Sequence, residues 1–429
     1  MATEIKVGLA GFGNVGKGTY DILKRNHSLI RQRAGAPISV KRVTVRNVDR
    51  VKLLVDEDVI VTNDWHDLVN DPEVNVVVEA MGGIEPAKSL ILAAIDAGKH
   101  VVTANKALLA EHGNEIFSAA QTKGVNVAFE AAVAGSIPIV KALREGLAAN
   151  RVSSIAGIIN GTCNFILSTM RDTGRSFDDV LKEAQRLGYA EADPTFDIEG
   201  TDSAHKLMLL SAIAFGVPVD MTKVHIEGIT HLEAKDIKFA EELGYRIKLL
   251  GITKYTDYGI ELRVHPALVP TRRLLANVEG AMNAVVVKGD AAESSLYYGK
   301  GAGVVADLID IARTAEVAVS ERPRMPTTTH NPKAKSFADF GDTVCSYYLR
   351  IPVEDKPGVL AEIARILADN KISIESLIQK EAPLEDASTE IILLTHSTRE
   401  ADIQRAIRTM QQLANVRGAI VLLRKEELQ

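Results

Sequence analysis

Ile5-Lys-Val-Gly-Leu-Ala10 runs directly into Gly11-Phe-Gly13-Asn-Val-Gly16, and this stretch decides the fold of the first part of the chain. The first run predicts a buried parallel strand, and the second is a G-x-G-x-x-G pattern that leads into a helix. Its glycines permit a tight turn, close approach of a pyrophosphate, and close packing of helix on strand. The pattern predicts a dinucleotide site rather than only a structural turn. The expected cofactor contacts are Gly11, Phe12, Gly13, Asn14, Val15 and Gly16.

Strand-like and helix-like segments alternate beyond this motif, as they do in a doubly wound parallel sheet of the Rossmann type. Further strands are expected at residues 39–45, 74–80, 100–103 and 124–130. A helix is expected from Pro86 to Ala97, and Gly98 is expected to end it. We therefore expect an NAD(P)-binding domain of the α/β class at residues 1–140, completed by a returning helix at about residues 304–320.

The residue after the second strand bears on which dinucleotide is bound. A carboxylate there would accept hydrogen bonds from the ribose hydroxyls of NAD, but the chain has Arg46-Asn47 instead. A guanidinium suits the 2′-phosphate of NADP better. We expect NADP to be preferred, with NAD still possible. The alternative for Arg46 is that it stacks on the adenine or faces solvent.

Lys106 follows closely on the strand His100-Val-Val-Thr103. Open α/β sheets bind ligands beyond the carboxyl ends of their strands. Thr103 and Lys106 are therefore expected at the ligand-binding edge of the sheet, and Lys106 is a strong candidate for the site.

An acidic stretch from Gly188 to Asp202 precedes a single lysine, Lys206. On a helix, Asp202 and Lys206 stand at positions i and i+4 of one face. A solvated ion pair worth about 0.3 to 0.5 kcal/mol is the plainer alternative. However, the residues after Lys206 are apolar through Leu210, which indicates a buried helix in which a lysine needs a reason to be present.

Composition excludes several classes of function. The 429-residue chain has 50 basic and 56 acidic residues, a net charge of −6 and no basic run, so nucleic acid and anionic membranes are not expected partners. Its longest apolar run is too short to span a bilayer. Two cysteines do not suffice for a disulfide framework or a metal cage. We expect a cytoplasmic protein of two or three domains that binds small molecules.

Cys163 has no histidine near it in the sequence, so we expect a small residue in a turn rather than a nucleophile. Ser176 and Asp179 form a capping box that predicts the start of a helix reaching Leu187. The histidines without partners at metal-ligand spacing are expected to be structural, and these are His66, His112, His205 and His231.

The remaining chain divides into three regions. Residues 141–303 predict an α+β domain that binds substrate and supports dimerisation. Residues 322–343 are rich in Pro, Thr and Lys and predict a linker. Residues 344–429 carry elements in the order βαββαβ, which is the split βαβ ferredoxin-like arrangement.

In combination, these motifs resemble homoserine dehydrogenase of the bacterial form with a C-terminal ACT regulatory domain. The resemblance runs nearly from end to end. The segments that carry it are Gly11–Gly16, Thr103–Lys106, Glu130–Pro138, Asn160–Phe165, Gly188–Pro194 and Asp197–Lys206.

The resemblance implies a role for each site residue. It makes Lys206 the catalytic proton donor and acceptor, and Lys106 a second lysine that contacts cofactor and substrate. It implies that Glu191 binds the substrate's amino group, while Asp197 and Asp202 complete the polar site. The chemistry agrees, because reducing an aldehyde builds alkoxide charge that a positioned cation stabilises and protonates. Aspartate semialdehyde also carries an ammonium and a carboxylate.

The resemblance further implies a sodium ion, feedback by threonine through the ACT domain, and a homodimer or homotetramer. The sodium site would be made largely of backbone carbonyls at Glu130, Val133, Gly135 and Ile137. Oxygen ligands suit a hard cation. The implied reaction belongs to the biosynthesis of threonine, methionine and isoleucine.

The chain departs from the family pattern at one position. Gly303, an expected cofactor contact, passes directly into Val304, where the family has a short segment of small and hydroxyl-bearing residues. This departure motivates an alternative, a non-catalytic sensor of amino acids and dinucleotides. A weaker alternative is an ACT-bearing 2-hydroxy acid dehydrogenase, which would need a histidine paired with a carboxylate.

Overall fold

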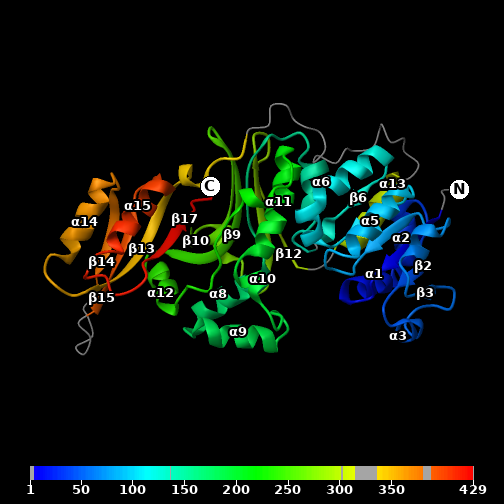
Figure 1. Ribbon diagram of the computed structural model, residues 1–429, viewed down its shortest axis with the longest axis horizontal. Helices are drawn as coiled ribbons and strands as arrows, with labels where there is room; N and C mark the ends of the chain where they lie inside the picture. Colours follow the sequence, from blue (N-terminus) through cyan, green and yellow to red (C-terminus); the bar gives the residue numbers. More distant parts are fainter. Residues whose placement is uncertain (1–3, 136, 301–302, 315–335, 380–387, 429) are drawn as a thin grey trace. The chain divides into compact units, whose positions relative to one another are not determined.

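The computed structural model describes residues 4–135, 137–300, 303–314, 336–379 and 388–428 (Figure 1). The chain forms two compact units, each assembled from separated stretches of sequence. Unit 1 comprises Met1–Val152, His205–Met221 and Gly289–Ala334, and unit 2 comprises Ser153–Ala204, Thr222–Lys288 and Lys335–Gln429. Within the described residues, no helix is long and apolar enough to cross a membrane.

Unit 1 contains a six-stranded sheet in the order β3-β2-β1-β4-β5-β6, and its strand pairs are parallel. The strands are β1 (Ile5–Ala10), β2 (Ile38–Thr44), β3 (Ile60–Thr62), β4 (Val76–Glu79), β5 (His100–Thr103) and β6 (Val127–Ala128). This order confirms the predicted doubly wound sheet, whose direction of winding reverses between β1 and β4. Strand β6 is shorter than expected because a 3₁₀ turn begins at Glu130.

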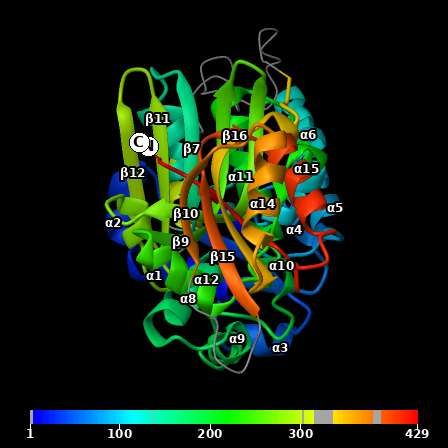
Figure 2. The same cartoon turned by 90° about the vertical axis from the view of Figure 1, so that its left-hand side faces the viewer.

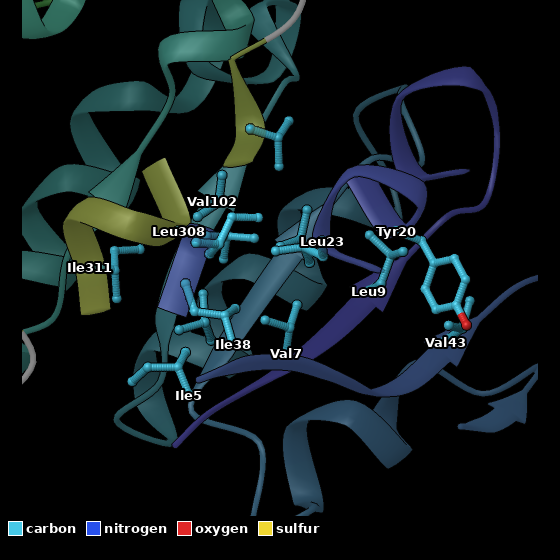
Figure 3. Close-up of a cluster of buried hydrophobic side chains, with 14 of the residues drawn as sticks. Ile5, Val7, Leu9, Tyr20, Leu23, Ile38, Val43, Val102, Leu308 and Ile311 are labelled. Carbon is cyan, nitrogen blue, oxygen red and sulfur yellow. The ribbon is translucent and has the colours of Figure 1, made fainter. Parts of the chain in front are cut away.

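Helices follow most of these strands. Those of unit 1 are α1 (Asn14–Arg25), α2 (His27–Ala34), α3 (Val48–Lys52), α4 (His66–Asn70), α5 (Ala87–Asp96), α6 (Lys106–Lys123), α7 (Ile139–Lys141) and α13 (Val304–Thr314), and a π-helical turn (Ala142–Gly146) follows α7. Helices α1, α2 and α13 bury apolar side chains on one face of the sheet. Figure 3 shows Leu23 and Leu308 meeting the strand residues Val7 and Val102 in this core. The part of the expected returning helix beyond Thr314, and residues 322–335 of the expected linker, lie outside the described residues.

Unit 2 contains a mixed sheet whose strands follow one another in the order β11-β7-β9-β10-β17-β13-β15-β14. They are β7 (Val152–Ile158), β9 (Tyr245–Thr256), β10 (Gly259–Pro270), β11 (Asn283–Gly289), β13 (Val344–Glu354), β14 (Ile374–Gln379), β15 (Ser388–Thr395) and β17 (Val421–Lys425). Strand β17 pairs in parallel with β10 at Ala267 and Leu268. The sheet of the C-terminal region is thereby continuous with that of the preceding region, and the edge of β17 is partly covered.

The C-terminal region confirms the predicted βαββαβ order. Its helices α14 (Val359–Asp369) and α15 (Glu400–Met410) lie side by side on one face of its sheet (Figure 2). Alternate residues of β13, among them Tyr347 and Leu349, point into the core beneath them. A short extra strand, β16 (Thr398–Arg399), pairs with β13.

The other helices of unit 2 are α8 (Gly161–Thr173), α9 (Phe177–Arg186), α10 (Thr195–Ile198) and α12 (Ala234–Glu242). Ser176 caps α9 by accepting a hydrogen bond from the Asp179 amide, as its capping box predicts. Helix α11 (Thr201–Phe215) begins in unit 2 and continues into unit 1. Strand β8 (His225–Ile226) pairs with β10.

Candidate functional site

The glycine turn between β1 and α1 has the geometry that dinucleotide binding requires. Gly11 has φ +97°, and a Cβ there would collide with the carbonyl oxygen of Ala80. A Cβ on Gly16 would collide with the carbonyl oxygen of Gly11, so close packing excludes any side chain. A Cβ on Gly13 would meet no protein atom within 4 Å. Gly13 is also the N-cap of α1 and provides no side-chain acceptor, which leaves the first amides of the helix suited to a phosphate.

Glu79 and Thr103 join the carboxyl ends of β4 and β5. The fully buried Glu79 accepts hydrogen bonds from the amides of Met81 (2.9 Å) and Gly82 (3.0 Å) and from Thr103 Oγ1 (2.6 Å). The Thr103 hydroxyl also accepts from the Asn105 amide at 3.0 Å. The Thr103 side chain is thus engaged within the protein, and Glu79 shapes the ligand-binding edge of the sheet.

Lys106 is the half-buried first residue of α6. Asn105 holds it in place from the N-cap position, because its Oδ1 accepts from the Leu108 amide (3.1 Å) and its Nδ2 donates to the Gly83 carbonyl (2.7 Å). The prediction that Lys106 lies just beyond a strand end is confirmed. Sequence reasoning missed Glu79 and Asn105, although a polar residue at the end of an apolar strand was a usable signal.

Arg46 is exposed and lies two residues beyond the carboxyl end of β2. The neighbouring end of β2 is fixed to the glycine turn, since the Gly11 amide donates to the Thr44 carbonyl at 2.9 Å. Asn47 begins α3 by accepting from the Arg50 amide at 3.1 Å. An exposed guanidinium at this strand end is compatible with a 2′-phosphate contact.

The acidic stretch forms a loop and the short helix α10 in unit 2. Glu191 is exposed, and its backbone carbonyl accepts from Gln185 Nε2 at 3.1 Å. Asp193 accepts from the Thr195 amide at 3.1 Å and shapes the turn at Pro194. Glu199, to which sequence reasoning gave no role, accepts from Thr230 Oγ1 at 3.1 Å.

Asp197 and Asp202 are brought together by a residue that sequence reasoning did not single out. Asn160 Nδ2 donates to Asp197 Oδ1 at 2.7 Å and to Asp202 Oδ2 at 2.8 Å. Asp202 is 3% exposed and Asn160 is 4% exposed, so the Asp202 side of the bridge is shielded from water, while Asp197 is half-buried. The signal that could have found it is the helix-capping position of Asn160 before Gly161.

The structure places Cys163 differently from the turn that the sequence predicts. It lies buried in the first turn of α8, not in a connecting turn, because the Asn160 cap starts the helix two residues earlier, at Gly161. Its Sγ donates to the Asp197 carbonyl at 3.2 Å. The thiol therefore supports the acidic loop through a hydrogen bond.

Lys206 and Asp202 occupy successive turns of α11, as their spacing predicts. The apolar residues Leu207 to Leu210 are all at most 1% exposed, so the prediction of a buried helix is confirmed. Lys206 itself is half-buried.

The segment after β6 carries the residues that are expected to bind sodium. Glu130 is 4% exposed, and its carboxylate accepts from the amides of Val140 (2.8 Å) and Lys141 (2.9 Å). Successive left-handed residues, Ala134 (φ 52°) and Gly135 (φ 67°), turn the backbone sharply here. The carbonyl of Ile137 accepts from the Ile139 amide at 2.7 Å, and Val133 is buried.

A second buried acid lies beside Glu130. Asp307 accepts from the Glu130 amide at 3.0 Å. Burial raises the pKa of both carboxyls, and the charge of Glu130 raises the pKa of Asp307 further. A cation would relieve this cost, and the oxygen donors fit one such as sodium. The described residues contain no cluster of three or more His, Cys, Asp or Glu side chains arranged for a metal. Gly303 packs on the same segment, where an added Cβ would lie 3.1 Å from Glu130 Cγ.

Unit 2 contains a histidine paired with a carboxylate, which the weaker hydroxy acid dehydrogenase alternative requires. His225 Nε2 lies 2.7 Å from Glu227 Oε1. The ring of His225 stacks on Phe340, and Arg424 binds Glu227 at 2.8 Å. These contacts join the pair to the C-terminal strands rather than to a dinucleotide turn.

Comparisons with known proteins agree with this architecture. Family models match for the NAD-binding domain of homoserine dehydrogenase (residues 11–130), for homoserine dehydrogenase (138–307) and for the ACT domain (347–415). The chain is 52% identical to the homoserine dehydrogenase of Pseudomonas aeruginosa and 51% identical to that of Neisseria gonorrhoeae, and each alignment covers 99% of both chains.

A crystal structure of a homoserine dehydrogenase from Thiobacillus denitrificans is similar to the whole chain. It superposes with a TM-score of 0.93 at 54% identity, over 100% of this chain and 99% of that one. The chain therefore belongs to the homoserine dehydrogenase family of oxidoreductases, with an NAD(P)-binding Rossmann domain and a C-terminal ACT domain.

Proposed function

We propose that the chain interconverts L-aspartate 4-semialdehyde and L-homoserine, with NADP preferred over NAD and with Lys206 as proton donor and acceptor. The observation that carries this proposal is helix α11, which presents Asp202 at its start and Lys206 one turn later. The glycine turn of unit 1 supports dinucleotide binding. Family membership favours this enzyme over the sensor alternative.

The chemistry assigns one task to each side chain. A bound NADPH would supply hydride to the aldehyde carbon. Lys206 donates its ammonium proton to the aldehyde oxygen as alkoxide charge develops, and in the reverse direction the neutral amine takes the proton from the hydroxyl. Lys106 contacts cofactor and substrate. Glu191 binds the substrate ammonium, and Asp197 and Asp202 complete the polar site.

The sodium site is part of the proposal. Glu130 and the carbonyls of Val133, Gly135 and Ile137 would hold the ion, and the two neighbouring buried acids support this assignment. Its role is to stabilise the folded segment between β6 and α7. A melting temperature that rises with sodium chloride more than with equal potassium chloride would support it. Equal responses to the two salts would contradict it.

The ACT domain indicates regulation by a small amino acid, and we propose threonine as the effector. The regulated reaction would serve the synthesis of threonine, methionine and isoleucine. ACT domains commonly pair with one another, which supports a homodimer or homotetramer. Titrating threonine into the activity assay, with serine as the control amino acid, tests the effector.

The central test is homoserine-dependent reduction of NADP and of NAD by the purified chain. We expect turnover with both cofactors and a lower KM for NADP. Binding of cofactor without turnover would instead support the sensor, and a lower KM for NAD would contradict the assignment of Arg46.

A further inference from the structure

Asn160 occupies a fixed position between β7 and α8. Its backbone is extended (φ −125°, ψ 111°), and its side-chain oxygen caps α8 by accepting from the Cys163 amide at 2.8 Å. Because that amide is a donor, the atom facing it must be Oδ1, so the NH₂ group must face the other way. The orientation of the side-chain amide is therefore determined by the helix it caps.

The NH₂ group of Asn160 uses its hydrogens on two carboxylates from different elements. Asp197 lies in α10 and Asp202 lies in α11, at 2.7 and 2.8 Å from the same nitrogen. A planar group with two N–H bonds fixes the angle between the carboxylates it binds. In the place of Asn160, a serine would provide only one donor, and a lysine or arginine would add a positive charge.

The cap itself is anchored to the rest of unit 2. A Cβ on Gly161 would lie 2.8 Å from the Ala281 carbonyl oxygen, so the start of α8 packs tightly on that loop. One turn later, Asn164 Nδ2 donates to the carbonyls of Val278 (3.1 Å) and Met282 (3.2 Å). Asn160 thus presents its NH₂ group from a site with little freedom to move.

We propose that Asn160 is a positioning residue that sets the spacing and direction of Asp197 and Asp202 for binding the cationic amino acid end of the substrate. The proposal rests on the proposed homoserine dehydrogenase activity. Asn160 suits this purpose because its amide joins the two acids without itself adding a positive charge. A cation in its place would compete with the substrate's ammonium group.

Asn160→Ser separates this role from helix capping. Serine caps helices about as well as asparagine but supplies no NH₂ group. We expect the KM for homoserine to rise at least about tenfold, the scale of lost hydrogen bonds to charged groups, while the KM for NADP changes less than about twofold. Asn160→Asp keeps both shape and cap but adds a third carboxylate, so its KM for homoserine should rise further.

Asn164→Ser is the matched control, because Asn164 is equally buried in the same helix but donates only to backbone carbonyls. It should lower the melting temperature without a selective change in the KM for homoserine. The proposal is wrong if Asn160→Ser keeps the wild-type KM, or if both of its KM values rise together as in a merely destabilised protein. The proposal is also wrong if the Asn160→Asp variant has the same KM values as the wild-type protein. A wild-type chain that does not oxidise homoserine would refute the proposed function, and the assignment of Asn160 would fall with it.

Discussion

Unit 2 holds buried and half-buried carboxylates in two different ways. Near α11, the neutral amide of Asn160 joins Asp197 and Asp202. At the junction between the ACT strands and the preceding region, arginine holds the acids instead. Arg424, with no exposed surface, donates to Glu227 at 2.8 and 2.9 Å and to Glu400 at 2.8 and 2.6 Å.

The junction therefore matches each buried charge with an opposite charge. Although burial alone would raise the pKa of Glu227, hydrogen bonds from His225 and Arg424 bring it well below its usual range. Arg263 has the same effect on the pKa of Glu426. Such a set of ion pairs favours one arrangement of the strands, because each charge is opposite a partner from another element.

The amide-held pair differs because its bridging group carries no charge. A neutral donor fixes the geometry of the two carboxylates without adding a positive charge to the pair. The contrast lies in the type of partner: charged groups hold the acids of the junction, whereas a neutral amide joins the pair that we propose for substrate binding.

The two regions are also connected. The Ile229 amide donates to the Ile198 carbonyl at 2.8 Å, and Thr230 Oγ1 donates to Glu199 at 3.1 Å. Glu227 lies immediately before this segment. The charged junction thus abuts the acidic loop through a few residues of backbone.

Among the predicted changes, Lys206→Ala should have the largest effect, and it acts on the region around α11. Loss of a general acid reduces turnover by about 10²–10⁴-fold, and we expect the melting temperature and the affinity for NADP to stay near wild type. Steady-state kinetics and a cofactor titration measure both. Unchanged turnover would show that Lys206 is an ion-pair partner and not the general acid.

Arg424→Met should affect stability instead of chemistry. Removing the arginine leaves the buried Glu400 and the half-buried Glu227 without their cation, and loss of one partner of a buried pair costs about 3 to 5 kcal/mol. Thermal unfolding should show a markedly lower melting temperature, while the KM for homoserine of the folded protein changes little. Combining it with Glu227→Gln and Glu400→Gln should recover part of the loss. A triple variant no more stable than the single one would argue against charge matching.

Acid should weaken the junction through groups whose pKa is depressed in the folded chain. Burial and the nearby Arg424 lower the pKa of His265 well below its usual range. In the unfolded chain this histidine gains a proton at about pH 6.5. The stability of the folded chain therefore falls as the pH drops below that value. Glu227 and Glu426 add a steeper loss below about pH 4.5, because their stabilisation is present above the unfolded pKa and disappears as they protonate.

Melting temperature measured from about pH 8 to about pH 3 tests this expectation. His265→Gln should remove the upper part of the decline and leave the lower part in place. A variant with an unchanged pH profile would show that His265 does not contribute.

Arg46→Ala should give the smallest effect, because an exposed arginine at a loop supports binding without supporting the fold. We expect the KM for NADP to rise several-fold more than the KM for NAD, with an unchanged melting temperature, and about 1 kcal/mol of lost contact accounts for such a ratio. Kinetics with both cofactors provide the measurement. Equal changes in the two KM values would contradict a 2′-phosphate contact.

Much of the architecture was predictable because its signals are local. The glycine motif, the alternation of strands and helices, the Ser176 capping box and the βαββαβ order each depend on residues close together in the chain. The placement of Lys106 at a strand end followed from the same patterns. Cys163 was misplaced because the cap at Asn160, which starts its helix, was not recognised.

Sequence alone thus determined the two folding patterns and the order of the candidate residues, because hydrophobic period, glycine geometry and capping act over a few residues. Tertiary structure alone decided which carboxylates meet which partners. Asn160 reaches Asp202 across 42 residues of chain, and Arg424 reaches Glu227 across 197. The tertiary structure also decided that β17 pairs with β10, because strand propensity does not determine which strands pair. Such contacts depend on packing over the whole unit, and no local pattern encodes them.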